Sequence, residues 1–299
     1  MRIQTEKERM RKHTDKDRMR IWVFGGGSLG LLYAAKLSAT DCEVVLVTRT
    51  HSQAQAIRSE GIGIKTEMTT TDDMRQVVAC AAVSMQELRD AKRHSIAPPD
   101  WILLTVKQYD LTDQVVRLLA SFAVRSEDTN LLALQNGIGH MEKLAAHMNK
   151  QQLYAAVVSE GALRTSSTEV VHTGFGLTKL GASLAENFVG ADSDQKIKQL
   201  QNVLQYAGFQ TVLSNQLNID IWQKLIVNSV INPLTALLQI RNGALLEHTN
   251  LQEIMYRLCE EAHAVAKQVG INLDNSETWR LLREVCRSTA ANKSSMLQD

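Results

Sequence analysis

Short apolar runs alternate with amphipathic segments in the first half of the chain, and their order predicts an α/β fold. Ile21–Phe24 and Glu43–Thr48 have β character, and the segment between them has the apolar spacing of a helix. Trp101–Val106 and Leu131–Leu134 are typical of strands that are buried on both faces of a parallel sheet. Alternation over residues 153–181 predicts antiparallel strands added to this sheet.

The pattern changes near residue 214, where Gly and Pro become scarce and a helical period dominates. An apolar stripe over Leu251–Val269 predicts one helix, and Gly270 supplies its C-terminal stop. A second helix of the same kind begins near Trp279. We therefore predict an all-helical domain over residues 215–299.

A glycine-rich turn, Gly25-Gly26-Gly27-Ser28-Leu29-Gly30, joins the first predicted strand to the following helix. This context turns a weak G-x-G-x-x-G match into an indication of a Rossmann-type dinucleotide-binding domain. Gly25 allows the tight turn, Gly27 lets a pyrophosphate approach the backbone, and Gly30 allows helix and strand to pack closely. Ser28 and Leu29 begin the helix, whose free N–H groups and dipole favour that pyrophosphate. The alternative is a glycine-rich turn that only reverses the chain.

The second strand ends at Arg49, at the position that commonly distinguishes NAD sites from NADP sites. An NAD site usually has Asp or Glu at this strand tip, where the carboxylate accepts hydrogen bonds from the ribose hydroxyls. Asp41 and Glu43 lie at the other end of this strand. A guanidinium instead matches a 2′-phosphate in bidentate geometry. We therefore predict NADP rather than NAD as the cofactor; the alternative is that Arg49 is an ordinary solvated side chain.

With 299 residues, of which 44% are hydrophobic, the chain is long enough for two globular domains of ordinary composition. Its formal net charge of +1 indicates neither a nucleic-acid partner nor a membrane surface. Positive charge gathers in residues 1–20, where eight Lys/Arg against four Asp/Glu give a net charge of +4. This segment has few apolar residues. We therefore predict a disordered or loosely helical extension over residues 1–18 and a Rossmann domain over residues 19–214.

The four cysteines, Cys42, Cys80, Cys259 and Cys286, lie far apart and show no paired spacing. They fit structural thiols in a reducing cytoplasm rather than a metal site or a disulfide framework. Uncharged apolar runs stay shorter than the ~20 residues that a membrane-spanning helix requires. We therefore predict a cytoplasmic protein, monomeric or homodimeric, that needs no metal and no membrane.

Polar residues also follow later strands of the predicted sheet. Lys107 comes after the run that ends at Val106, and Asn136 comes after the run that ends at Leu134. Because open parallel sheets bind ligands outside the carboxyl ends of their strands, Arg49, Lys107 and Asn136 should face one crevice. Lys107 is a candidate for contacting cofactor phosphate or substrate, and Asn136 for contacting the nicotinamide ribose or the reacting group. A solvated lysine at a strand end is the alternative for Lys107.

A second polar cluster lies within an apolar segment of the helical domain. Lys224, Asn228 and Asn232 are spaced at i, i+4 and i+8, on one face of a helix among Leu, Ile and Val neighbours. Such residues are costly there unless they are hydrogen-bonded or face a ligand. Burial also lowers the pKa of a lysine toward the range that suits proton donation near neutrality. Pro233 is predicted to end or kink this helix; a polar face in solvent is the alternative.

Taken together, these motifs resemble those of the ketopantoate reductase (2-dehydropantoate 2-reductase) family, from Met19 to Asp299. The resemblance rests on the order and spacing of GGGSLG (25–30), Arg49, VKQYD (106–110), LQNGIG (134–139), KLIVNSVINPLTAL (224–237), RNG (241–243) and NKSSMLQD (292–299). It implies a Rossmann domain, a helical C-terminal domain and an active site in the cleft between them. It also implies the NADPH-dependent reduction of 2-dehydropantoate to pantoate, on the route to pantothenate and coenzyme A.

The resemblance also assigns roles to individual residues. Lys224 is the implied general acid that protonates the ketone oxygen. Arg49 and Lys107 match NADP contacts of the family, and we assign Asn136 to the cofactor as well. Five further residues match positions that hold the substrate: Asn228, Asn232, Asn242, Asn292 and Ser295. On composition alone, residues 292–299 would be a frayed terminus.

Members of this family continue past the SSMLQD motif through further helices, which carry a glutamate that hydrogen-bonds the substrate. The sequence here ends at Asp299, and we therefore interpret it as truncated. Two other functions stay open. One is the reduction of another branched 2-oxo acid on the same scaffold, and the other is NADP binding without catalysis.

Overall fold

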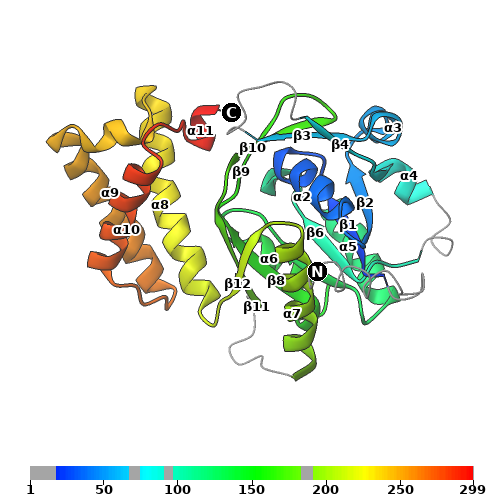
Figure 1. The fold of residues 1–299 in the computed structure, drawn as a ribbon. Helices are drawn as coiled ribbons and strands as arrows, with labels where there is room; N and C mark the ends of the chain where they lie inside the picture. The colour runs from blue at the N-terminus through cyan, green and yellow to red at the C-terminus, as the bar shows by residue number, and fades with distance from the viewer. Residues whose placement is uncertain (1–17, 67–74, 91–96, 183–190, 299) are drawn as a thin grey trace, which may run out of the picture. The chain divides into compact units, whose positions relative to one another are not determined.

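The computed structural model describes residues 18–66, 75–90, 97–182 and 191–298 (Figure 1). The extension predicted for residues 1–18 lies outside these ranges except for its last residue. The chain divides into two compact units. The first contains the residues up to Gln135 together with Gly139–Asn215, and the second contains Asn136–Ile138 and the residues from Gln216 onward.

An eight-stranded sheet forms the centre of the first unit, in the order β12-β11-β8-β7-β6-β1-β2-β5. Its strands span Arg20–Phe24 (β1), Glu43–Thr48 (β2), Ala81–Ser84 (β5), Trp101–Leu104 (β6), Asn130–Ala133 (β7), Leu153–Val158 (β8), Leu177–Ala182 (β11) and Gln210–Leu213 (β12). Six neighbouring strands, from β5 to β8, run parallel, and β11 pairs with β8 in the antiparallel sense. The predicted Rossmann-type α/β fold is confirmed by this strand order.

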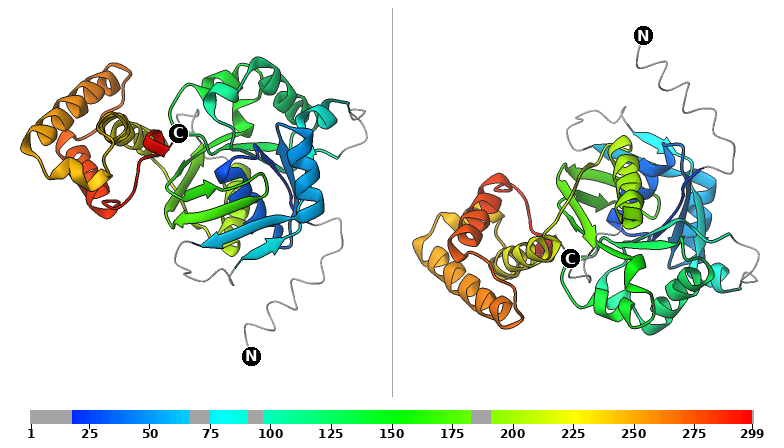
Figure 2. Two further views of the ribbon diagram at one scale, coloured as in Figure 1. Left: turned by 90° about the horizontal axis from the view of Figure 1, so that it is seen from above. Right: turned by 90° about the horizontal axis from the view of Figure 1, so that it is seen from below.

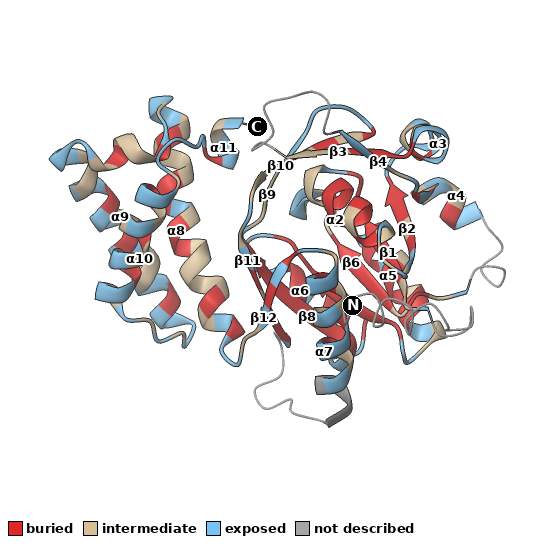
Figure 3. Cartoon of the chain, viewed as in Figure 1, coloured by how far each residue is buried: buried red, intermediate tan, exposed pale blue. Residues whose placement is uncertain are grey.

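Helices cover both faces of the large sheet (Figure 2). They span Ser28–Ser38 (α2), His51–Glu60 (α3), Met85–Asp90 (α4), Asp113–Arg125 (α5), His140–Ala145 (α6) and Ala191–Tyr206 (α7). On one face, Ile21 and Val23 of β1 share a core with residues of α2, α3 and α7. On the other face, Trp22 of β1 meets Phe122 of α5 edge to face, with ring centroids 4.8 Å apart. The central strands are therefore buried along their whole length (Figure 3).

A smaller sheet, in the order β4-β3-β10-β9, packs against α2, so that this helix lies between two sheets (Figures 1 and 2). Its strands span Ile62–Thr66 (β3), Gln76–Val78 (β4), Gly161–Arg164 (β9) and Glu169–Gly174 (β10). The prediction that residues 153–181 add antiparallel strands to the main sheet is wrong in part. Within this segment, β8 is parallel to β7, β9 and β10 belong to the smaller sheet, and only β11 adds an antiparallel strand to the main sheet, beside β8. Alternation marks a half-buried strand, but it does not identify the strand's partner.

The described residues of the second unit form helices joined by turns and loops, and they contain no strand. Its elements span Leu217–Leu238 (α8), Asn242–Leu246 (the 3-10 turn η4), Thr249–Gln268 (α9), Asn275–Ser288 (α10) and Ser295–Gln298 (α11). Buried side chains of α8, α9 and α10 form one core, which includes Ile226, Val230, Met255, Cys259, Leu282 and Cys286. The prediction of an all-helical C-terminal domain is confirmed, including the helix end before Gly270.

The sequence predicts that Pro233 ends or kinks α8. The first alternative is wrong, because α8 continues to Leu238, and a kink stays a prediction. Pro233 has no N–H for the carbonyl of Ser229, but Ser229 is exposed, so solvent can supply the missing bond. The end of the chain is also more ordered than its composition predicts, because Ser294 is buried and its Oγ lies 2.7 Å from Oγ1 of Thr235.

Within the described ranges, no helix has the length and apolar character needed to cross a bilayer. Nor do the His, Cys, Asp and Glu side chains of these ranges gather into a group that could hold a metal ion. All four cysteines are free thiols.

Candidate cofactor and active site

The carboxyl ends of the central parallel strands meet at one edge of the large sheet. Phe24 of β1 pairs with Val47 of β2 on one side and with Leu104 of β6 on the other. The residues that follow these strands therefore lie side by side, at the edge where parallel sheets bind their ligands. They are the glycine turn after β1, Arg49 after β2 and Lys107 after β6.

The glycine turn has a geometry that requires glycine at two positions. Gly25 has a φ of +126°, and its N–H donates to the carbonyl oxygen of Val47 at 2.9 Å. A Cβ on Gly30 would lie 1.7 Å from the carbonyl oxygen of Gly25, so any side chain there would collide with the backbone. A Cβ on Gly27, in contrast, would meet nothing within 4 Å. Packing therefore does not require glycine at position 27, where the backbone remains open to a ligand.

The helix α2 begins at Ser28, and no side chain caps it at Gly27. The first N–H groups of a helix have no partner within the helix, and they form the positive end of its dipole. Leu29 and Gly30 continue this first turn. An uncapped helix start beside an open glycine fits the phosphate groups of a dinucleotide.

Two side chains that the sequence pattern did not indicate hold this turn in place. Gln53 Nε2 donates to the carbonyl oxygen of Gly26 at 2.8 Å, and Arg164 Nη1 donates to the same oxygen at 3.2 Å. The backbone N–H of Arg164 also donates to Ser28 Oγ at 3.1 Å. These residues lie 27 and 138 positions away from Gly26, and no local motif marks them.

Arg49 is largely exposed after β2, and its guanidinium faces a carboxylate. Nη1 lies 3.6 Å from Oδ1 of Asp110. Asp110 belongs to a 3-10 turn, η2 (Gln108–Asp110), which follows β6. Sequence reasoning considered only the acidic residues of the second strand, and it therefore missed an acid that comes from a neighbouring loop.

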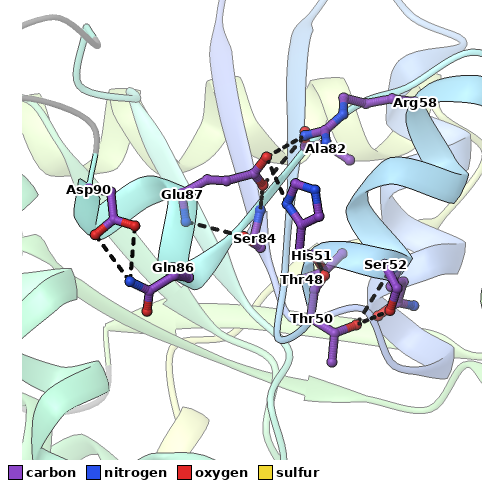
Figure 4. A network of polar contacts seen from close by, with 11 residues as sticks. Thr48, Thr50, His51, Ser52, Arg58, Ala82, Ser84, Gln86, Glu87 and Asp90 are labelled. Carbon is purple, nitrogen blue, oxygen red and sulfur yellow. Dashed lines mark hydrogen bonds and ion pairs between the residues drawn. The ribbon is translucent and has the colours of Figure 1, made fainter.

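A network of polar contacts fixes the chain beside Arg49 (Figure 4). Ser84 and Glu87 form a reciprocal capping box, in which the Ser84 N–H donates to the carboxylate at 2.7 Å and the Glu87 N–H donates to Ser84 Oγ at 3.1 Å. The backbone bond from Ser84, with help from the guanidinium of Arg58, lowers the pKa of Glu87 to about 2. His51 Nδ1, at the start of α3, lies 3.1 Å from the same carboxylate. The segment that follows Arg49 is therefore held to the end of β5.

Lys107 and Asn136 are both exposed after β6 and β7. Their neighbours tie these strand ends together, because Gln135 Nε2 donates to the carbonyl oxygen of Val106 at 2.7 Å. His140 Nδ1 lies 3.1 Å from Gln108 Nε2, and burial lowers the pKa of this histidine. The contacts of Lys107 and Asn136 with a cofactor stay predictions.

In the helical unit, Lys224, Asn228 and Asn232 lie on one face of α8, and all three are half-buried. Burial lowers the pKa of Lys224 to about 8. An amine with such a pKa is largely protonated at neutral pH and gives up its proton more readily than an ordinary lysine. This face of α8 therefore presents a proton donor, Lys224, followed about one and two helical turns later by the amides of Asn228 and Asn232.

The remaining polar candidates come together at the far end of α8. The Asn242 N–H donates to the carbonyl oxygen of Asn292 at 3.1 Å. Asn242 is buried, and its Nδ2 donates to Thr289 Oγ1 at 2.9 Å, while Oδ1 has no hydrogen-bond partner among the described residues. Ser295 is exposed at the start of α11, a helix that packs against α8. The backbone N–H of Asn242 thus holds the segment that carries Asn292. The side-chain nitrogen of Asn242 is also bonded within the fold, to Thr289.

The strand order, the open glycine turn and the uncapped helix define a dinucleotide-binding protein of the Rossmann class. Residues 21–184 match the family described as "Ketopantoate reductase PanE/ApbA", and residues 216–299 match "Ketopantoate reductase PanE/ApbA C terminal". The chain belongs to the ketopantoate reductase family.

Individual relatives agree with this assignment. A 2-dehydropantoate 2-reductase of Bacillus subtilis is 36% identical over 94% of this chain and 84% of its own length. One from Halobacterium salinarum is 30% identical over 94% of this chain and 86% of its own length. The crystal structure of "Probable 2-dehydropantoate 2-reductase panE" from Bacillus subtilis has a TM-score of 0.73 at 33% identity, and the match covers 94% and 86% of the two chains. A D-mandelate dehydrogenase in complex with NADH and anilino(oxo)acetate, 21% identical with a TM-score of 0.80, shares the fold, with 94% and 85% of the two chains covered.

Proposed function

We propose that this protein reduces 2-dehydropantoate to pantoate with NADPH, in the biosynthesis of pantothenate and coenzyme A. Relatives named 2-dehydropantoate 2-reductase support the reaction. The observation that carries the chemistry is a half-buried lysine, Lys224, whose pKa burial lowers to about 8. A carbonyl reduction requires a proton donor of this kind at the ketone oxygen.

The first unit offers groups that fit each charged part of the cofactor. We assign the pyrophosphate to the open backbone at Gly27 and the first N–H groups of α2, and the 2′-phosphate to Arg49. Lys107, which follows β6, is also proposed to contact the cofactor. So is Asn136, which follows β7 but belongs to the second unit. When bound, NADPH supplies the hydride for the reduction.

The second unit offers groups that fit a small hydroxylated 2-oxo acid. Lys224 holds a proton at Nζ and is proposed to donate it to the ketone oxygen. Amide and hydroxyl groups can donate to the carboxylate and accept from the hydroxyl of such a substrate. We propose that these groups come from Asn228, Asn232, Asn242, Asn292 and Ser295. The proposed reaction therefore requires both predicted domains, residues 19–214 and residues 215–299.

The setting of the reaction is also a proposal. Free thiols at Cys42, Cys80, Cys259 and Cys286 support a reducing compartment, and we propose the cytoplasm. We propose a monomer or a homodimer that acts on a small molecule.

The direct test is NADPH consumption, followed by absorbance, with ketopantoate and a panel of other branched 2-oxo acids. We expect the highest kcat/KM with ketopantoate. A higher kcat/KM with another 2-oxo acid would instead identify a different reductase on this scaffold. Tight NADPH binding without turnover on any acid of the panel would show a non-catalytic binding protein.

Charge reversal at Arg49 should separate the two cofactors. We expect Arg49→Glu to raise the Kd for NADPH about 100-fold, because a bidentate charged contact with the 2′-phosphate is lost. The Kd for NADH, which has no such phosphate, should change far less. Fluorescence titration measures both constants, and Arg117→Glu, on the exposed side of α5, controls for the change in net charge. Equal losses for the two cofactors would refute the assignment of the 2′-phosphate to Arg49.

A further inference from the structure

An acidic side chain lies beside the residue that we assign to the 2′-phosphate. Asp110 Oδ1 is 3.6 Å from Arg49 Nη1. Arg49 follows β2 and Asp110 lies in the turn after β6, and β1 lies between these two strands. The ion pair therefore reaches across the carboxyl end of β1, where the chain enters the glycine turn.

The backbone of the turn η2 holds Asp110 independently of this ion pair. The Asp110 N–H donates to the carbonyl oxygen of Lys107 at 3.0 Å, and the Asp110 carbonyl oxygen accepts from the Thr112 N–H at 2.9 Å. The side chain of Asp110 is 34% exposed, whereas that of Arg49 is 74% exposed. The long arginine side chain can therefore turn toward a ligand, while the short carboxylate stays in place.

We propose that Asp110 sets the cofactor preference of this site by competing with the 2′-phosphate for the guanidinium of Arg49. The inference rests on the proposed function, which assigns that phosphate to Arg49. A 2′-phosphate carries more than one negative charge near neutral pH, so the carboxylate repels the group that Arg49 attracts. NADH has a ribose hydroxyl in place of this phosphate, and a carboxylate can accept its hydrogen bond.

Asp110 consequently weakens the binding of NADPH and strengthens that of NADH, so that the preference of the site for NADPH becomes smaller. The guanidinium has five N–H donors, so it can keep one contact with Asp110 while it binds the phosphate. NADPH therefore still binds in the presence of Asp110, but with a lower affinity than it would have without this carboxylate. NADH has no 2′-phosphate, so the carboxylate does not repel it. Because an exposed ion pair contributes little to folding, removal of the carboxylate should leave the fold intact.

The test is Asp110→Asn, which removes the charge and keeps the size of the side chain. We expect the Kd for NADPH to fall about fivefold and the Kd for NADH to rise about twofold, so that the ratio changes about tenfold. Both constants are measured by fluorescence titration of the full chain at one ionic strength. The effect on NADPH should diminish at high salt, because the charges are exposed.

Asp113→Asn is the matched control. Asp113 lies close by in the sequence, but its carboxylate pairs with Lys143 Nζ at 3.0 Å instead of with Arg49. This variant should keep the original ratio of the two constants, and so should Asp110→Glu, which retains the charge. An unchanged ratio in Asp110→Asn, or an equal shift in either control, overturns the inference. A parent chain that binds neither dinucleotide would instead refute the proposed function itself.

Discussion

Replacement of Lys224 by alanine is expected to lower the turnover of ketopantoate by ~100-fold or more, the usual loss when a general acid is removed. Burial lowers the pKa of this lysine to about 8, so its ammonium is both present and acidic enough to protonate the ketone oxygen at neutral pH. Alanine has no proton to donate. Initial rates of NADPH consumption at saturating substrate measure the effect.

Two further measurements separate loss of chemistry from loss of structure. The Kd for NADPH should stay the same in Lys224→Ala, because the groups assigned to the cofactor phosphates belong to the other unit. Lys267→Ala removes the same charge from the last turn of α9 and should keep full activity. Unchanged turnover in Lys224→Ala would exclude this lysine from the mechanism.

The pH dependence follows from the same group. Reduction needs the protonated form of Lys224, so kcat/KM should be constant well below pH 8. It should then fall by about tenfold per pH unit above that value. Oxidation of pantoate needs the unprotonated amine as a base, and its kcat/KM should rise through the same region. Initial rates in both directions across this range provide the measurement. A reduction rate that rises with pH would contradict the role of Lys224 as the acid.

The sequence predicted the parts of the cofactor site whose constraints are local. The positive φ of Gly25 and the close approach at Gly30 both follow from a strand that turns directly into a helix, and the structure confirms them. Gln53, Arg164 and Asp110 could not be found in this way. They reach the turn and Arg49 from other elements, and only the folded chain brings them there.

In the helical unit, too, the sequence predicts local arrangements but not contacts between distant segments. The spacing of Lys224, Asn228 and Asn232 is enough to place them on one face of α8, because a helix has a fixed period. The bond between Thr235 and Ser294 depends instead on how the end of the chain folds back onto α8. A run of small polar residues looks like a disordered terminus until the partner for its hydroxyl groups is known.

Gly30→Ala is expected to destabilise the first unit by about 3 kcal/mol or more, at the upper end of the range for overpacked sites. The added Cβ would lie 1.7 Å from the carbonyl oxygen of Gly25 and 2.8 Å from Thr105 Oγ1. The first of these atoms belongs to the backbone of a turn that the Gly25–Val47 hydrogen bond fixes. The strain therefore has to move α2 away from β1. Thermal unfolding followed by circular dichroism should show a lower Tm, and NADPH binding should be lost with the turn.

Gly27→Ala distinguishes a ligand requirement from a packing requirement at the same turn. A Cβ here meets no atom within 4 Å, and Gly27 has a φ of −81°, which alanine adopts readily. The Tm should therefore stay close to that of the parent chain. The Kd for NADPH should nevertheless rise by about tenfold or more, because the methyl group occupies the space through which the pyrophosphate approaches the backbone. If Gly27→Ala bound NADPH as tightly as the parent chain, the pyrophosphate could not lie at this turn, and glycine at position 27 would have no role in binding.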